Sequence, residues 1–186
     1  MVDLLTYLQA IQPISAELAA AIQAGIKREY FPSRHLLLRP GQVARQIHFI
    51  EQGLVHGFGI YRDRKVSSWF MREGDFVISV ISFITQSPSA EYVELLEPSV
   101  VDSLSYDSLQ QLYQQFPEFN RIGRMLTEKY YVLSEQRAHS LRTANAAERY
   151  ANLLREFPDI FQRVQVKQIA SYLGIVPETL SRLRAR

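Results

Sequence analysis

Apolar side chains in the first thirty residues recur at the spacing of helices that bury one face. The two series are Leu4, Leu5, Leu8 and Ile11, followed by Leu18, Ala19, Ile22 and Ile26. Pro13 interrupts the pattern, and Ser15 stands just before the second series, where a serine side chain can cap a helix. The pattern therefore predicts two short helices.

From about Tyr30 to Tyr106 the pattern changes to short strand-like runs separated by turn residues. The turns are Pro40-Gly41, Gln52-Gly53, Arg62-Asp63 and Gly74-Asp75. The predicted strands are His35–Leu38, Ile47–Glu51, Leu54–Tyr61, Lys65–Met71, Glu91–Leu95 and Ser99–Ser105. Short strands at regular spacing are typical of a sandwich or jelly roll, so we expect a β-roll here.

After Tyr106 the pattern is helical to the end of the sequence. We expect a helix over Leu109–Gln115 capped by Asp107 or Ser108, and a long helix from about Glu118 to at least Ala138. A further helix, Ala147–Phe157, should begin after Thr143 or Asn145 and end at Pro158.

One side of the long helix carries an apolar stripe of Ile122, Leu126, Tyr130 and Leu133. Such a stripe can pack on the chain's own β domain. It is also suited to a coiled-coil seam between two copies of the chain. We expect a homodimer through this stripe, and packing within the chain is the alternative.

The last twenty residues have the spacing of a helix-turn-helix. Ala170 provides a small residue where two helices cross, Gly174 provides the turn, and Leu180 and Leu183 provide the apolar face of the second helix. Ile169 and Leu173 give the first helix its stripe, and Pro177 suits the start of the second. An ordinary helical hairpin packed on a core is the alternative interpretation.

Charge is distributed unevenly along the chain. Residues 1–120 contain 9 Lys and Arg and 13 Asp and Glu, a net of −4, whereas residues 121–186 contain 12 and 6, a net of +6. Positive charge is thus concentrated near the helix-turn-helix, as binding to phosphates requires, although a solvated basic helix face would look the same.

The composition excludes several classes of protein. The chain has 186 residues and no cysteine, so disulfides, thiolate metal sites and cysteine nucleophiles are excluded. No signal peptide and no apolar stretch of membrane-spanning length is visible, so we expect a cytoplasmic protein without a membrane partner. We also find no nucleophile–base pair and no phosphate loop, so we do not expect an enzyme.

The order of β-roll, long helix and C-terminal helix-turn-helix resembles the Crp/Fnr family of transcription regulators over nearly the full chain. Pro40-Gly41, the run Ile47–Val55 and Gly74-Asp75-Phe76-Val77 look like the glycine-punctuated strands and the phosphate-binding cassette of cyclic-nucleotide-binding domains. The resemblance implies an α+β fold with a sensor domain at 1–117, a dimerisation helix at 118–141 and a DNA-binding domain at 142–186. It also implies double-stranded DNA, a second copy of the chain, RNA polymerase and an unknown small-molecule effector as partners.

The resemblance weakens at the nucleotide pocket. Ile78-Ser79 stands where nucleotide-binding members have Gly-Glu, and Pro88-Ser89-Ala90 stands where they have Arg-Ser-Ala. Loss of the arginine removes a charge-assisted contact that is typically worth about two orders of magnitude in affinity. We therefore do not expect cyclic AMP to bind in the usual way. The candidate effector-pocket residues are Arg72, which could supply the missing cation, with Phe76, Ser79, Ser89 and Ala90.

Other cofactors find little support. An iron–sulfur cluster would need cysteines, which the chain lacks. His35, His48 and His56 could suggest a cupin-like metal site, but they are scattered at spacings of thirteen and eight, so surface or strand-packing histidines are the better interpretation.

The second helix of the motif carries the candidate readout. By resemblance, Glu178 could accept from a cytosine amino group, and Arg182, four residues later, could address guanine. Candidate phosphate contacts are Lys167, Gln168, Thr179, Ser181 and Arg184. An intrahelical ion pair between Glu178 and Arg182 is the alternative.

Two further expectations concern the DNA-binding end. Many family members follow the recognition helix with a β-hairpin wing, and this sequence stops at Arg186, so either the wing is dispensed with or the sequence is truncated. Without a wing we expect weaker anchoring to the DNA backbone and greater reliance on the dimer. The competing interpretation of the whole chain is a cyclic-nucleotide or other small-molecule binding module whose DNA-binding head is vestigial.

Overall fold

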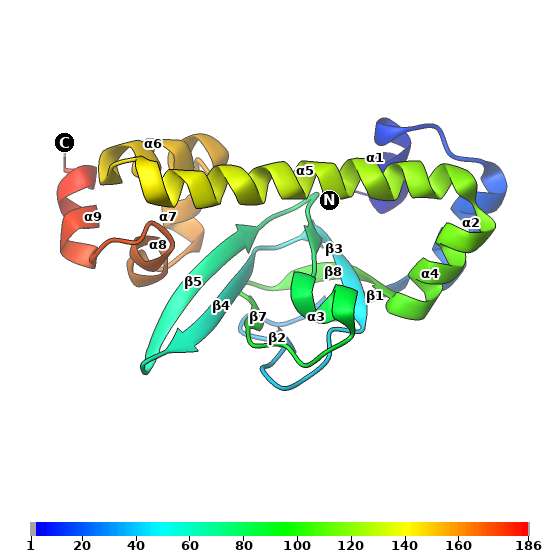
Figure 1. The fold of residues 1–186 in the computed structure, drawn as a ribbon, viewed down its shortest axis with the longest axis horizontal. Helices are drawn as coiled ribbons and strands as arrows, with labels where there is room; N and C mark the ends of the chain where they lie inside the picture. Colours follow the sequence, from blue (N-terminus) through cyan, green and yellow to red (C-terminus); the bar gives the residue numbers. More distant parts are fainter. Residues whose placement is uncertain (1–2, 186) are drawn as a thin grey trace. The chain divides into compact units, whose positions relative to one another are not determined.

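The computed structural model describes residues 3–185 and divides them into two compact units (Figure 1). The first unit comprises the described chain up to Gly57 together with Phe70–Leu126. The second comprises Phe58–Trp69 together with the described chain from Thr127 onward. The long helix and two strands contribute residues to both units, and each unit is described below by itself.

The first unit begins with two capped helices. Helix α1 spans Leu4–Ile11 and helix α2 spans Ala16–Gly25. The Ser15 side chain accepts a hydrogen bond from the backbone N–H of Leu18 at 3.1 Å, which confirms the predicted cap.

In residues 3–185, eight strands form two sheets. They are β1 (Lys27–Phe31), β2 (Leu36–Leu38), β3 (Gln46–Gln52), β4 (Val55–Tyr61), β5 (Arg64–Met71), β6 (Phe76–Val77), β7 (Tyr92–Leu95) and β8 (Ser99–Ser105). One sheet has the order β1-β8-β3-β6 and the other β2-β7-β4-β5. The predicted β-roll is therefore present as two four-stranded sheets, which agrees with the mixed fold expected from the sequence.

The sequence pattern missed three elements of the first unit. Strand β1 has the sequence Lys-Arg-Glu-Tyr-Phe, which gives no apolar alternation because the strand lies at the edge of its sheet and is largely exposed. Strand β6 has two residues, and helix α3 (Val80–Thr85) has six, so both are too short to show a period.

Helices cover the outer face of the β1-β8-β3-β6 sheet. Helix α4 spans Tyr106–Gln115, and helix α5 spans Pro117–Thr143. Side chains from α1, α2, α4 and the first part of α5 line a common apolar space with β3, β6 and β8; they include Leu8, Ile22, Leu109, Phe119 and Phe49. The predicted α4 cap at Asp107 or Ser108 was wrong. Ser105, still in an extended conformation at the end of β8, accepts from the backbone N–H of Ser108 at 3.0 Å.

A glycine is required at the turn between β3 and β4. Gly53 has a φ of +121°, a conformation that L-residues with side chains rarely adopt. A Cβ atom there would lie 2.7 Å from the Ser99 Cβ and 3.1 Å from the Ser99 Cα, so the turn closes directly against the start of β8.

The second unit contains most of α5 and four shorter helices. They are α6 (Ala146–Glu156), α7 (Ile160–Arg163), α8 (Val166–Tyr172) and α9 (Pro177–Arg184). Asn145 caps α6 in a reciprocal capping box with Glu148, which decides between the two predicted caps. The buried core of these helices includes Leu153, Phe157, Ile160, Ile169, Leu173 and Leu180.

No helix in the described part of the chain is long and apolar enough to cross a membrane.

Candidate functional site

The helices α8 and α9 are joined by a tight, glycine-dependent turn. Gly174 has a φ of +65° and follows the end of α8. The backbone N–H of Ile175 donates to the Ala170 carbonyl at 3.0 Å, and that of Gly174 donates to the Ser171 carbonyl at 3.0 Å. These two bonds form a Schellman motif, which ends α8 and redirects the chain into α9 at Pro177.

The inner face of the α8–α9 pair is apolar, and most of the residues that the sequence assigned to it are buried. Ile169 and Leu180 have no exposed surface, and Ala170 is 1% exposed. Leu183 is half-buried. The small side chain of Ala170 therefore lies in the packed interior of this pair, where the predicted motif requires it.

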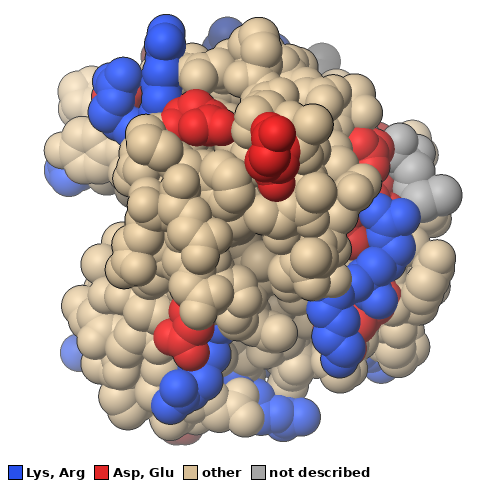
Figure 2. Space-filling view, turned by 90° about the vertical axis from the view of Figure 1, so that its right-hand side faces the viewer, with Lys and Arg blue, Asp and Glu red and all other residues tan. Residues whose placement is uncertain are grey.

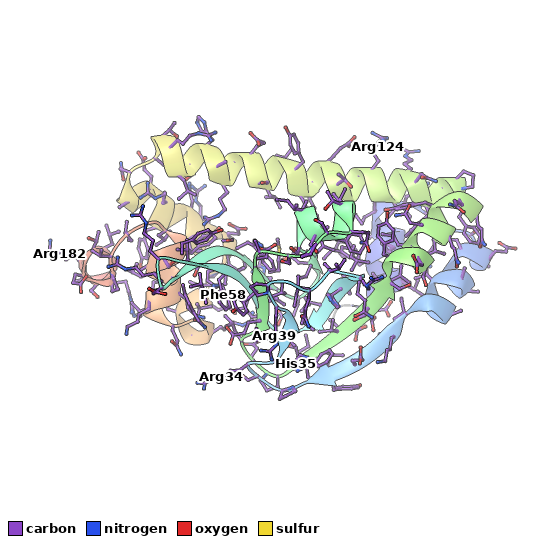
Figure 3. The ribbon with its side chains drawn as sticks, turned by 60° about the horizontal axis from the view of Figure 1, so that its bottom comes forward. Arg34, His35, Arg39, Phe58, Arg124 and Arg182 are labelled. Carbon is purple, nitrogen blue, oxygen red and sulfur yellow. The ribbon has the colours of Figure 1, made fainter. Side chains whose placement is uncertain are left out.

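The outer face of α9 is polar and exposed. Glu178, Ser181 and Arg182 are exposed, and Thr179 is half-buried. Figure 3 shows the Arg182 side chain pointing outward from α9. Within the described residues, neither Glu178 nor Arg182 forms an ion pair, so both side chains remain available to a ligand.

The remaining candidate phosphate contacts have different surroundings. Lys167 is exposed on α8. The Gln168 side chain accepts from the backbone N–H of Gln165 at 3.3 Å and so caps α8. The Arg184 guanidinium lies 4.3 Å from the centre of the Phe161 ring. Gln168 and Arg184 thus have structural partners that the sequence did not indicate.

Segment Phe58–Trp69, the outer part of the β4–β5 hairpin, belongs to the same unit as these helices. The Ser171 hydroxyl on α8 accepts from the backbone N–H of Ser67 at 2.9 Å and donates to the Lys65 carbonyl at 3.3 Å. These bonds join residues more than a hundred positions apart. The hairpin therefore contacts α8 directly.

A half-buried arginine, Arg137, links three segments of the second unit. From α5, Arg137 donates through Nε to the Ser68 carbonyl at 2.8 Å and through Nη2 to the Tyr172 carbonyl at 2.9 Å. Its guanidinium also lies 3.5 Å from the centre of the Tyr172 ring. Burial is the main influence on this group, and it lowers the pKa of Arg137 below its ordinary value. Sequence reasoning missed Arg137, because its spacing on α5 marks no face.

The predicted dimer stripe on α5 changes its surroundings along the helix. Ile122 has no exposed surface, and Leu126 is half-buried against the core of the first unit. Tyr130 is half-buried, and only Leu133, which is 41% exposed, offers substantial apolar surface. Ile122 is therefore a core residue of the first unit, in line with the alternative that the sequence left open.

Other apolar side chains on α5 are exposed. They are Met125, Tyr131, Val132 and Leu141, in addition to Leu133. Met125 and Val132 are seven residues apart, which is the spacing of one coiled-coil position in successive heptads.

The structure does not bring the five candidate effector-pocket residues together around one cavity. Phe76 packs against the rings of Phe49 and Tyr7, with centroid distances of 5.0 and 5.8 Å. Ser79 and Ser89 are buried and hydrogen-bonded to each other at 3.1 Å, while Ala90 is exposed.

Arg72 lies at the turn between β5 and β6. Its backbone N–H donates to the Asp75 carboxylate at 3.1 Å. Arg72 does not line the cavity of the first unit that is described next, whereas Ser79 does.

That cavity measures about 430 Å³ and lies in the first unit. Its apolar lining comprises Leu37, Leu38, Val43, Ala44, Val77, Ile78 and Val93, and its polar lining includes Gln46, His48, Ser79, Gln86 and Tyr106. Ser103 Oγ lies 2.8 Å from His48 Nδ1, and Nε2 makes no hydrogen bond with a described residue. Burial lowers the pKa of His48 to about 4, so the imidazole is neutral at physiological pH.

The histidines do not assemble a metal site. His35 stacks on Phe31 at 4.4 Å and His56 on Phe70 at 4.9 Å. Across residues 3–185, no group of three or more His, Cys, Asp or Glu side chains could hold a metal ion.

Two buried carboxylates on the β1-β8-β3-β6 sheet pair with an exposed arginine. Arg28 binds Asp102 through two hydrogen bonds of 2.9 and 3.0 Å and also pairs with Glu51. Burial, followed by the neighbouring Asp102 carboxylate, raises the pKa of Glu51. Because Arg28 offsets two buried carboxylates on adjacent strands, this cluster is explained by the stability of the sheet.

The two units differ in charge. The second unit has 13 Lys and Arg and 7 Asp and Glu, a net of +6, which leaves the first with 8 and 12, a net of −4. Figure 2 looks onto the α2 and α4 end of the first unit, where basic and acidic atoms form small separate groups on a mostly uncharged surface. The net positive charge is therefore carried by the second unit, which favours that unit for attraction to a polyanion.

Residues 28–116 match the family described as Cyclic nucleotide-binding domain. No curated protein sequence matches the chain. Three solved structures show what the fold resembles. The global regulator CLP of Xanthomonas campestris, described as c-di-GMP responsive, is 21% identical, with 92% of this chain and 90% of that chain covered and a TM-score of 0.69.

FixK2 from Bradyrhizobium japonicum is 19% identical, with 86% and 83% covered and a TM-score of 0.73. A protein from Eubacterium rectale assigned to the Crp/Fnr family of transcriptional regulators is 11% identical, with 96% and 85% covered and a TM-score of 0.74. Residues 28–116 are thus similar to a cyclic-nucleotide-binding domain, and the chain shares its fold with these three proteins, of which the one from Eubacterium rectale is assigned to the Crp/Fnr family.

Proposed function

We propose that this protein is a sequence-specific, dimeric DNA-binding transcription regulator of the Crp/Fnr type. The observation that carries the proposal is the α8–α9 pair. Its buried Ala170 and Leu180 and its glycine turn form a helix-turn-helix, and its outer face presents Glu178 and Arg182 without ion-pair partners among the described residues. The net charge of +6 on the second unit supports the same conclusion.

The experiment is selection of bound fragments from a genomic DNA library, with binding measured over a range of salt concentrations. An enriched sequence would support the proposal, and uniform recovery of fragments would contradict specific readout. Arg182→Ala should then cost about 1–3 kcal/mol on the enriched site and little on random DNA. Arg142→Ala, which removes an exposed arginine from α5, is the matched control.

Dimerisation along α5 is part of the proposal. Because Ile122 is buried in the first unit, the seam we propose uses Met125, Val132 and Leu133, which are exposed. Val132→Glu should shift the protein from dimer to monomer in analytical ultracentrifugation. Leu141→Glu places the same charge at another exposed apolar residue of α5, outside the proposed seam, and should leave the protein dimeric.

We further propose that the roll does not bind cyclic AMP in the usual way. The Ser79 hydroxyl is already bonded to Ser89, and Pro88 offers neither a cation nor an N–H. Saturating cyclic AMP should therefore leave the Tm unchanged, because a ligand that binds the native state must raise it. A clear increase in Tm would refute this part of the proposal.

A second candidate function is a small-molecule binding module with a vestigial DNA head. The cavity of about 430 Å³ beside His48 favours it, because this volume is enough for a small molecule and the lining combines apolar side chains with polar groups that could orient one. A protein that gains stability from a small molecule yet retains no DNA fragment at low salt would support this alternative.

A further inference from the structure

The turn of the β4–β5 hairpin carries a group of exposed basic side chains. Arg62, Arg64 and Lys65 are exposed and are accompanied by one carboxylate, Asp63, so the turn has a net charge of +2. Arg62 and Asp63 both have positive φ, 48° and 60°, as a two-residue hairpin turn requires. Neither Arg62 nor Arg64 forms a hydrogen bond or ion pair with a described residue.

The hairpin is fixed to the first helix of the proposed helix-turn-helix. Ser171 on α8 bonds the backbone of Ser67 and of Lys65, and Arg137 bonds Ser68 and Tyr172 together. The Lys65 ammonium also lies 4.4 Å from the centre of the Phe58 ring, so the hairpin has its own side-chain packing. In Figure 1 the outer end of the hairpin lies below α8.

The position of α8 indicates which part of a DNA duplex the hairpin would meet. In a helix-turn-helix the second helix enters the major groove while the first crosses the phosphate backbone. Lys167 and Ser171 are four residues apart and share a face of α8. The hairpin is bonded to Ser171, so it lies on the face of α8 that also carries Lys167. A DNA duplex bound in this way would place its phosphate backbone beside that face.

We infer that the β4–β5 hairpin is a second DNA-contacting element, which binds backbone phosphates through Arg62 and Arg64. The inference rests on the proposed DNA-binding function. Contacts of this kind fix the position of the protein and raise affinity without reading sequence. The hairpin thus serves as a wing, although it comes from the β-roll segment of the sequence.

The test compares two double variants that lose the same charge. Arg62→Gln with Arg64→Gln changes the hairpin, and Arg34→Gln with Arg39→Gln changes two exposed arginines on loops of the first unit (Figure 3). Binding to a fluorescein-labelled 30-base-pair duplex of random sequence is measured by anisotropy over a series of salt concentrations. Circular dichroism of all three proteins checks that each is folded.

Loss of two phosphate contacts should reduce the slope of log K against log salt by about 1.8 for each bound protomer, and weaken binding roughly 10- to 100-fold at 0.1 M salt. The first-unit variant should match the wild type. Ser171→Ala, which removes the hairpin's bonds to α8 without changing charge, should also lower the slope.

Two results would overturn the inference in distinguishable ways. If the wild type binds the duplex and the hairpin variant has the same slope, the hairpin does not contact DNA, and its exposed Ile60, Tyr61 and Val66 would instead suit a protein partner. If the wild type does not bind the duplex even at low salt, the proposed DNA-binding function fails, and the inference fails with it.

Discussion

Replacing Arg137 by methionine should destabilise the second unit more than removing any exposed charge from α5. Methionine replaces the unbranched stem of the side chain as far as Nε but lacks the guanidinium, so it loses both hydrogen bonds, to Ser68 at 2.8 Å and to Tyr172 at 2.9 Å. Bonds from a charged donor are worth about 1.5–3 kcal/mol each, and the contact with the Tyr172 ring adds about 0.5–2 kcal/mol. The cost of burying the guanidinium offsets part of this stabilisation in the wild type. We therefore expect Arg137→Met to lower the free energy of unfolding by about 2–4 kcal/mol.

Amide hydrogen exchange measures this effect locally. The Ser67 N–H, which donates to Ser171, should exchange faster by roughly two orders of magnitude in Arg137→Met, because about 3 kcal/mol is equivalent to that factor. The control is Arg142→Met, five residues along the same helix, where the side chain is exposed. Equal exchange of Ser67 in the two variants would show that Arg137 does not hold the hairpin against α8.

Three further changes test other parts of the structure. Burial holds the pKa of His48 at about 4 in the folded protein, against 6.5 in the unfolded chain, so the unfolded chain takes up a proton first as the pH falls. The free energy of unfolding should therefore decrease between pH 6.5 and pH 4, by up to about 3 kcal/mol. In urea titrations His48→Gln should remove this pH dependence, whereas the control His139→Gln should keep it. Gly53→Ala should lower the Tm strongly, because the new Cβ would lie 2.7 Å from that of Ser99 at a φ of +121°; an unchanged Tm would contradict this close packing of the turn against β8. Asn145→Ala should cost about 1 kcal/mol through loss of the α6 cap, and a loss below about 0.3 kcal/mol in chemical denaturation would show that the capping box adds little.

Local signals in the sequence predicted the elements whose cause is local. The turn at Gly174 and the helix start at Pro177 follow from backbone conformations that few residues favour, and the observed α8 and α9 agree with them. The cap at Ser15 follows from the same kind of reasoning. These features depend on residues within a few positions of one another, so a single sequence contains the information.

The residues around the cavity could not be predicted in the same way. Successive residues of a strand point to opposite faces, so an error of one position exchanges the inside for the outside. Phe76 was a candidate pocket residue, but its ring packs on Phe49, and its neighbour Val77 lines the cavity. The cavity also draws on segments from Leu37 to Asp107, whose proximity depends on the whole sheet topology.

The partners of Ser171 show a second limit of sequence reasoning. Serine and lysine backbone groups more than a hundred positions away carry no recognisable pattern, yet they place segment 58–69 in the same unit as α8. When the charges are counted along the sequence on either side of residue 120, Arg62, Arg64 and Lys65 fall in the acidic part, residues 1–120. In the structure these three cations belong to the basic unit.

The regrouping leaves the net charge of the basic part at +6 and changes where that charge lies. Arg121 and Arg124 belong to the first unit, and the hairpin, with its net of +2, takes their place in the second. The Ser171 bonds hold this hairpin charge beside α8, and screened electrostatic attraction acts over about 10 Å, so the proposed phosphate contacts depend on cations placed in this way. A DNA-binding domain defined as 142–186 would omit both the hairpin and Arg137, which joins the hairpin to the end of α8 at the Tyr172 carbonyl. The surface proposed to bind DNA is therefore assembled from segments that are not contiguous in the sequence.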